Sequence, residues 1–217
     1  MPIRWNVPQH AAASERLDAA LAETAPAGRG APGAVILGPD GVGKSTLARV
    51  AAERVGRDHP DTLVRWVTGT STERAVPFGA FSHLVQIADI GKPAALLRAA
   101  RASLGGDDLL LVVDDAQHLD MLSATLVYQV ARAGAARLIV TARADSAPDA
   151  VAALWTDGLL TRIDIEPPGG ATSPAEVDAF VAELPAAARS VLDYLAVCEP
   201  LSLNDLNVLA GEGAVAD

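Results

Sequence analysis

The residues with the clearest chemical signature form a glycine-rich loop, Gly38-Pro39-Asp40-Gly41-Val42-Gly43-Lys44-Ser45-Thr46. The loop matches G-x-x-x-x-G-K-[ST], the phosphate-binding P-loop, and lies between an apolar run (34–37) and a helical pattern (47–52). Its glycines let consecutive backbone N–H groups turn inward toward an anion, and the helix N-terminus adds partial positive charge. The alternative is a glycine-rich turn that matches by chance, and the flanking pattern argues against it. The sequence therefore predicts a site for a nucleoside triphosphate or diphosphate.

Individual residues of this loop have separate expected roles. Lys44 can reach the β- and γ-phosphates, and the Ser45 hydroxyl can ligate Mg²⁺. The contacts to the nucleotide are predicted to come from Gly38, Asp40, Gly41, Val42, Gly43, Lys44, Ser45 and Thr46. Upstream, Pro8 is a candidate cover for the adenine, together with Arg4, Trp5 and Val7. A terminus that contacts nothing is the equal alternative.

A pair of acidic residues, Asp114 and Asp115, ends the apolar run 109–113. A strand that ends in Asp puts a carboxylate at the carboxyl edge of a parallel sheet, where such sheets bind ligands. We expect Asp114 to hold Mg²⁺ through water and Asp115 to polarise the attacking water. Many hydrolytic relatives carry Glu at the second position, and the shorter Asp predicts slow hydrolysis. An Asp-Asp pair that caps the next helix is the alternative.

Thr141 and Arg143 end the next apolar run, 137–141. If this strand lies beside the P-loop strand, both side chains face the γ-phosphate. Arg143 could then detect that phosphate through a charge-assisted contact, and a solvated arginine is the alternative. The chain has 4 histidines, which are scattered, and 1 cysteine, so the sequence offers no zinc site. His118 is more readily explained as a residue at a helix start or interface than as a catalyst.

Apolar runs that alternate with helical patterns predict an α/β fold. The expected strands span 34–37, 63–67, 109–113, 138–141 and 160–165. Those at 63–67 and 160–165 are expected at the edges, because they contain polar residues. Helices are expected at 14–21, from the P-loop to about 56, through 84–87 after a lead-in at 76–81, and at 93–104, 122–132 and 148–155. This alternation predicts a parallel sheet with helices on both faces, and with the P-loop it predicts a five-stranded parallel P-loop NTPase sheet sandwiched by helices.

A proline- and glycine-rich stretch divides the chain. We predict a nucleotide-binding domain over 1–166, a linker over 167–174 and a small helical segment over 175–217. Within the last segment, helices are expected at 175–198, with an interruption at Pro185, and near 204–210. This segment is too small to form a core alone, so it is expected to dock on the sheet domain.

Bulk composition narrows the possible partners and the compartment. Among 217 residues the net charge is −10, which argues against a chain-wide basic surface for nucleic acid. The single cysteine excludes an intrachain disulfide and favours a reducing cytoplasm. No apolar stretch is long enough to span a membrane, so no membrane partner is expected.

Three stretches together resemble the STAND class of signalling P-loop ATPases, in particular MalT-like and large LuxR-type transcriptional regulators. The resemblance rests on residues 112–120 (VVDDAQHLD), on Thr141-Ala142-Arg143 and on residues 76–80 (VPFGA). A tryptophan-centred turn, 154–158, adds to it. The resemblance covers about residues 30–166 and implies the strand order 5-1-4-3-2. Similarity to Orc1-type AAA+ modules is weaker, although the architecture is shared.

The resemblance implies a nucleotide-dependent switch. ADP would hold a closed resting state, whereas ATP and an inducer would favour an open, self-associating state that hydrolyses ATP slowly. Family members usually insert a helical bundle where this chain has only the linker, and they carry a DNA-binding domain that is absent from this sequence. Residues 184–206 resemble the start of a winged helix. A fragment or a naturally shortened relative is the expectation.

Two other functions remain open at this point. One is an Orc1-type AAA+ ATPase that acts on DNA within an assembly, and the other is a small-molecule kinase. The order of the strands separates the kinase from the rest. A kinase requires the strand at 63–67 beside the P-loop strand, whereas the signalling class requires the strand at 138–141 there.

Overall fold

The structure is a computed structural model, and it divides the chain into two compact units, Met1–Pro168 and Gly169–Asp217. The residues described are 8–22, 31–84, 93–104, 108–166, 181–182, 184–197 and 203–211. The boundary between the units falls within the stretch predicted as a linker, 167–174, which itself lies outside the described residues.

Five parallel strands form one sheet in the first unit. They are β1 (Gly33–Leu37), β2 (Leu63–Thr68), β3 (Leu109–Asp114), β4 (Arg137–Ala142) and β5 (Thr161–Asp164). Their order across the sheet is β2-β3-β4-β1-β5, with every pairing parallel. This is the predicted order, so the predicted fold class is confirmed. The kinase alternative is wrong, because β1 lies between β4 and β5 and does not pair with β2.

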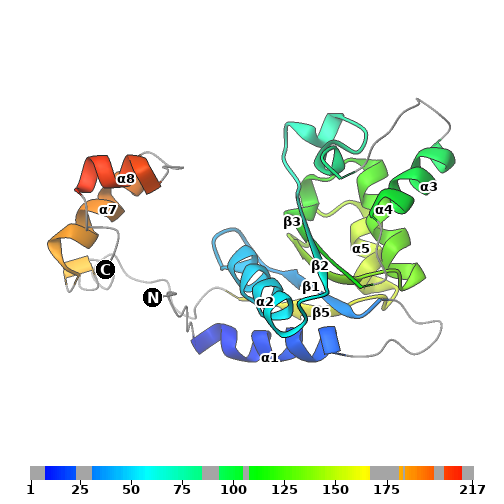
Figure 1. The fold of residues 1–217 in the computed structure, drawn as a ribbon, viewed down its shortest axis with the longest axis horizontal. Coiled ribbons are helices and arrows are strands. Elements are labelled where there is room, and N and C mark those ends of the chain that lie inside the picture. Colours follow the sequence, from blue (N-terminus) through cyan, green and yellow to red (C-terminus); the bar gives the residue numbers. More distant parts are fainter. Residues whose placement is uncertain are drawn as a thin grey trace. The chain divides into compact units, whose positions relative to one another are not determined.

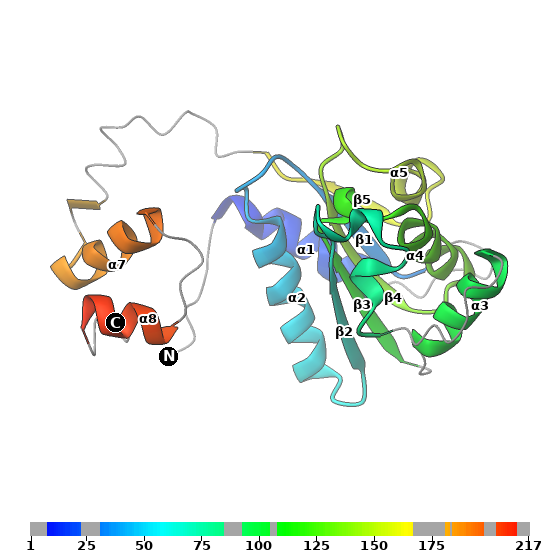
Figure 2. The same cartoon turned by 90° about the horizontal axis from the view of Figure 1, so that it is seen from above.

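Helices cover both faces of this sheet. They are α1 (Pro8–Ala22), α2 (Lys44–Asp58), α3 (Pro93–Leu104), α4 (Met121–Ala133) and α5 (Asp149–Thr156), with short 3₁₀ turns η1 (Glu73–Ala75), η2 (Gly79–Phe81) and η3 (Ala116–His118). In two perpendicular views, α1 and α2 lie on one face and α3, α4 and α5 on the other (Figure 1, Figure 2).

The core consists of two apolar layers, one on each face of the sheet. Along β1, Val35 and Leu37 join the layer under α3, α4 and α5, whereas Ala34 and Ile36 join the layer under α1 and α2. Every residue of β1 and of β3 is buried. A strand between two helical layers must be apolar on both faces, which is why these strands are continuous apolar runs in the sequence.

The stretch after β2 leads toward a predicted helix that lies mostly outside the described residues. That helix is expected through residues 84–87, whereas the described part ends at residue 84 and contains the turns η1 and η2. Phe78 has a φ of 56°, which no residue inside an α-helix adopts. Both Phe78 and Phe81 are fully buried, so these turns are fixed by two aromatic side chains packed in the core.

Helix α1 begins earlier than predicted. The sequence suggested an irregular segment up to residue 13, because Pro8 breaks regular elements. Pro8 is instead the first residue of α1. Proline fits the first turn of a helix because its missing N–H group has no helical partner there. Leu17 and Leu21, one turn apart, are buried against the sheet.

In the second unit, α7 (Ala186–Val197) and α8 (Leu203–Ala210) pack against each other. Pro185 lies just before α7, where an interruption was expected. Leu206 is buried, whereas Tyr194 and Val208 are exposed. Over the whole described part of the chain, no helix has the length and apolarity needed to cross a membrane.

Candidate functional site

The loop between β1 and α2 turns on two glycines with left-handed backbone conformations. Gly41 has a φ of 78° and Gly43 a φ of 90°. Gly43 is the N-cap of α2, and its position carries no side-chain capping hydrogen bond. The first N–H groups of α2 therefore have no capping side chain among the described residues. Such free N–H groups, together with the helix dipole, form an anion-binding site.

Gly43 also touches α1. A Cβ atom at this position would lie 2.5 Å from Cε1 of His10. A side chain at position 43 is therefore disfavoured by the backbone angle, and it would also require the His10 side chain to move. His10 was missed in the sequence, because its contact with the loop depends on how α1 packs. Pro8, the predicted adenine cover, begins the same helix, whereas Arg4, Trp5 and Val7 lie outside the described residues.

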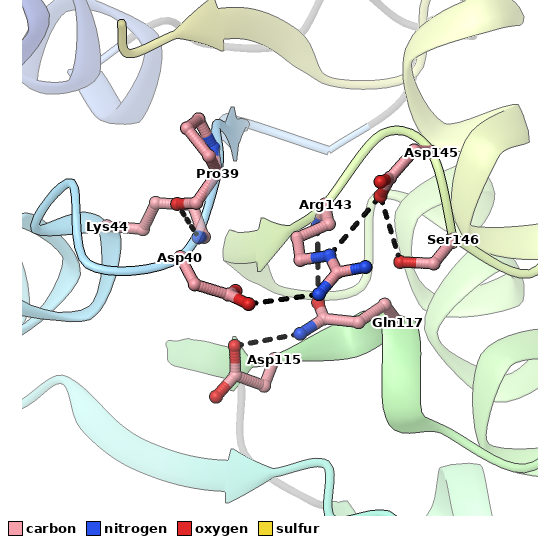
Figure 3. Close-up of polar contacts among 8 residues, drawn as sticks. All are labelled: Pro39, Asp40, Lys44, Asp115, Gln117, Arg143, Asp145 and Ser146. Atoms are coloured by element: carbon pink, nitrogen blue, oxygen red, sulfur yellow. Dashed lines mark hydrogen bonds and ion pairs between the residues drawn. The ribbon is translucent and has the colours of Figure 1, made fainter. Parts of the chain in front are cut away.

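Lys44 is folded back into the loop. Its Nζ donates a hydrogen bond of 2.8 Å to the backbone carbonyl of Pro39, and the residue is only 6% exposed. A buried ammonium group is rare unless it is paired or binds an anion. The loop therefore holds a positive charge beside the free N–H groups of α2 (Figure 3).

A buried carboxylate, Asp114, lies directly against α2. Its Oδ1 accepts hydrogen bonds from Ser45 Oγ at 2.9 Å and from Thr141 Oγ1 at 2.5 Å. The structure therefore brings together three residues from α2, β3 and β4, as the strand order requires. A hydroxyl and a carboxylate are hard oxygen donors, so this pair fits the ligands that Mg²⁺ prefers.

Asp115 follows with a left-handed backbone, at a φ of 50°. Its N–H donates to Thr141 Oγ1 at 2.9 Å, and its Oδ1 accepts from Gln117 Nε2 at 3.0 Å. Gln117 is 3% exposed and accepts, through Oε1, a hydrogen bond of 3.2 Å from the N–H of Arg143. Gln117 thus joins Asp115 to Arg143. The sequence did not predict this role of Gln117, because the role depends on tertiary contacts with Asp115 and Arg143.

The alternative explanation of the acidic pair, a helix cap, does not fit the structure. Asp115 precedes η3 but makes no side-chain capping bond. The cap of α4 is a different residue, Asp120, whose Oδ1 accepts from the N–H groups of Leu122 at 2.9 Å and Ser123 at 3.1 Å. Asp114 and Asp115 are therefore not needed to begin the next helix.

Arg143 reaches the P-loop instead of bulk solvent. Its Nη1 lies 2.9 Å from Asp40 Oδ2, and its Nε lies 3.3 Å from Asp145 Oδ1 (Figure 3). The hydrogen bond to Asp40, followed by that to Asp145, raises the pKa of the Arg143 guanidinium, which stays charged. Hydrogen bonds from Ser146 and then Arg143 lower the pKa of Asp145. Arg143 is therefore paired with two carboxylates, and 35% of its side chain remains exposed to solvent.

A cavity of about 850 Å³ adjoins this part of the loop, at the carboxyl ends of β1, β4 and β5. Its charged lining residues are Asp40, Arg143, Asp145, Arg162, Asp164 and Glu166. The volume is sufficient for a small-molecule ligand. Among the described residues, no group of three or more His, Cys, Asp or Glu side chains is arranged to hold a metal ion by itself.

The fold and the loop together define a class. In this parallel sheet, β1 leads through a glycine loop into α2. Strand β4 lies between β1 and β3, and β3 ends in Asp114. This arrangement is the P-loop NTPase fold.

The comparison with domain III of a DnaA protein supports this fold. No protein-family model matches the sequence, and no curated protein matches it either. Domain III of the replication initiation protein DnaA from Thermotoga maritima matches with a TM-score of 0.52 and 20% identity, covering 93% of this chain and 91% of that domain. Pif1 helicase from Candida albicans matches with a TM-score of 0.49 and 14% identity, over 93% of this chain and 49% of the helicase. AMPPCP-bound DnaA from Aquifex aeolicus gives 0.46 and 16%, over 96% and 64%.

The likeness to domain III of DnaA shows a shared fold. None of these comparisons confirms the resemblance to MalT-like or LuxR-type regulators, which rests on the sequence motifs alone.

Proposed function

We propose that this chain binds ATP and ADP together with Mg²⁺ and uses the bound nucleotide as a switch. The observation that carries the proposal is the contact between Ser45 and Asp114 at 2.9 Å, beside a glycine loop that encloses Lys44. Phosphate-binding N–H groups, a lysine and a pair of magnesium-type ligands then lie within one small region. Each is found alone in many proteins, but their combination on this strand order is specific.

The residues divide the work of binding. The N–H groups of the loop and the Lys44 ammonium would hold the phosphates. Ser45 and Asp114 would hold Mg²⁺, with Thr141 orienting the carboxylate of Asp114 through its hydroxyl. Bound Mg²⁺ would neutralise phosphate charge. The buried position of Asp114 keeps this carboxylate away from competing water.

Hydrolysis is proposed to be slow. In this proposal Asp115 polarises the attacking water, but one of its carboxylate oxygens already accepts a hydrogen bond from Gln117. A carboxylate that is partly occupied, on a side chain shorter than that of Glu, is less able to reach and orient a water molecule. Slow turnover would suit a switch, because the bound nucleotide persists long enough to be read by a partner.

The setting of the switch has two candidates. The fold of domain III of DnaA, a replication initiation protein, supports an AAA+-type ATPase that works on DNA in an assembly. The fold favours this setting over a transcriptional regulator, which is supported by the sequence motifs alone. With a net charge of −10, this chain would approach DNA through partners or a local basic patch.

The direct test is titration of the purified protein with Mg·ATP and with Mg·ADP by isothermal calorimetry. Lys44→Ala should weaken both by about 10- to 100-fold, the effect of losing a charge-assisted hydrogen bond. Arg57→Ala, an exposed cation in the last turn of the same helix, is the matched control and should bind as the wild type does. Absence of heat with either nucleotide in the wild type would refute the proposal.

Sedimentation separates the two settings. A DnaA-like ATPase should associate on duplex DNA with Mg·ATP and lose the DNA steeply as salt rises. A regulator module should self-associate with Mg·ATP whether or not DNA is present.

A further inference from the structure

The P-loop carries one feature that opposes its expected ligand. Asp40 is the only acidic residue between Gly38 and Thr46. Free N–H groups and Lys44 attract phosphate, whereas a carboxylate in the same loop repels it. A loop that only bound phosphate would gain nothing from this residue.

The carboxylate of Asp40 is directed at one partner. Its Oδ2 lies 2.9 Å from Nη1 of Arg143, at the end of the neighbouring strand β4. Asp145 holds the same guanidinium from another side, through Nε at 3.3 Å, and is itself bonded to Ser146 at 3.1 Å. The backbone of Arg143 is fixed by Gln117. Arg143 therefore faces the P-loop with its charge already satisfied by carboxylates (Figure 3).

We propose that Asp40 determines the preference of the site between diphosphate and triphosphate nucleotides. This inference rests on the proposed function. Asp40 and a γ-phosphate are both anions, and Arg143 is the cation that each would use. A diphosphate leaves the pair between Asp40 and Arg143 in place. A triphosphate must either displace the carboxylate from Arg143 or lie beside it unpaired.

The consequence is a bias toward the ADP-bound state. Both outcomes make the binding of a triphosphate less favourable in free energy, whereas a diphosphate binds without disturbing the pair between Asp40 and Arg143. Asp40 therefore lowers the affinity for ATP relative to ADP. The side chains of Arg143 and Asp40 are 35% and 71% exposed, which limits the size of the effect through solvent screening. Replacement of the carboxylate should shift the ratio of affinities by about two- to fivefold, the range of exposed charge pairs.

A structural role for Asp40 makes a different prediction. If the pair only tied the loop to β4, its loss would change loop order and the binding of both nucleotides together. The ratio of the two affinities would stay constant. The measurement therefore needs the ratio and not either constant alone.

The experiment is calorimetric titration of the full chain with Mg·ADP and with a non-hydrolysable Mg·ATP analogue at low salt. Asp40→Asn should raise the affinity for the triphosphate by about two- to fivefold relative to the diphosphate. In an Arg143→Ala background the same substitution should change the ratio less. Asp61→Asn, an exposed carboxylate at the opposite end of α2, controls for net charge and should leave the ratio unchanged.

Equal ratios in the wild type and Asp40→Asn would overturn this inference and leave the proposed function intact. A wild type that binds neither nucleotide would overturn both. A gain that persists in full without Arg143 would also overturn the inference, because the competition for that guanidinium would then be irrelevant.

Discussion

Replacing Thr141 by valine tests the polar network under the proposed magnesium site. Thr141 is fully buried, and its hydroxyl serves two partners at once. It donates to Asp114 Oδ1 at 2.5 Å and accepts from the N–H of Asp115 at 2.9 Å. Valine has nearly the same shape but lacks the hydroxyl, so Thr141→Val removes both hydrogen bonds with little change in packing volume.

The expected loss follows from these two contacts. A hydrogen bond to a charged carboxylate contributes about 1.5–3 kcal/mol, and the amide bond to the hydroxyl about 1 kcal/mol. Their loss, with a buried N–H left unpaired, should destabilise the first unit by about 2–4 kcal/mol. For a unit of this size, each kcal/mol lowers Tm by about 2–4 °C, so a fall of about 5–15 °C is expected.

Thermal unfolding followed by circular dichroism measures this change, and two variants control it. Thr141→Ser keeps the hydroxyl and should retain most of the stability. Thr125→Val removes a hydroxyl that donates to the carbonyl of Met121 at the surface of α4, and should change Tm little. If Thr141→Val melts within about 2 °C of the wild type, the hydroxyl does not support Asp114 and the reasoning fails.

Two further predictions concern acidic residues. Asp115→Asn should leave the affinity for Mg·ATP unchanged. It should lower the rate of ATP hydrolysis in single-turnover assays by about 10²-fold, the effect of losing a general base. An equal rate in the wild type and the variant would show that Asp115 does not polarise the attacking water. Asp108 should make stability depend on acid pH, because hydrogen bonds from Thr62 and then Arg137 lower its pKa from 3.8. Because this pKa is lowered, the ionised carboxylate of Asp108 stabilises the fold above pH 3.8, and this stabilisation is lost as the pH falls below that value. The stability advantage of the wild type over Asp108→Asn in urea unfolding should therefore shrink below pH 3.8, and an advantage independent of pH would contradict the assignment.

Which strands lie at the centre of the sheet and which at its edges was predictable, because these positions depend on local signals in the sequence. A glycine loop after one apolar run and an acid after another assign those strands to the centre, and the polar residues in β2 and β5 assign those to the edges. Such patterns survive packing, since a strand buried on both faces cannot tolerate charge. The same reasoning predicted that Ser45, Asp114 and Thr141 would meet at one sheet edge.

What could not be predicted depends on tertiary contacts. The turns η1 and η2 are one example, because burial of Phe78 and Phe81 fixes them with a left-handed backbone at Phe78. The contacts of His10 with Gly43 and of Asp40 with Arg143 join segments that no local pattern relates. Propensity ranks local conformations, whereas these contacts are selected by the packing of whole elements.

One buried amide joins the parts of the site that would respond to the terminal phosphate. Gln117 donates to the carboxylate of Asp115 and accepts from the backbone of Arg143, so neither can shift without changing its bond to the amide. Arg143 in turn reaches the P-loop through Asp40. Because the amide of Gln117 is buried, water cannot replace a hydrogen bond that it loses. A shift of Asp115 or Arg143 that breaks such a bond therefore leaves a buried polar group unpaired and costs free energy. The P-loop residue Asp40 is therefore connected, through Arg143 and Gln117, to Asp115, the residue proposed to polarise water, and this connection passes through the backbone of the residue after β4.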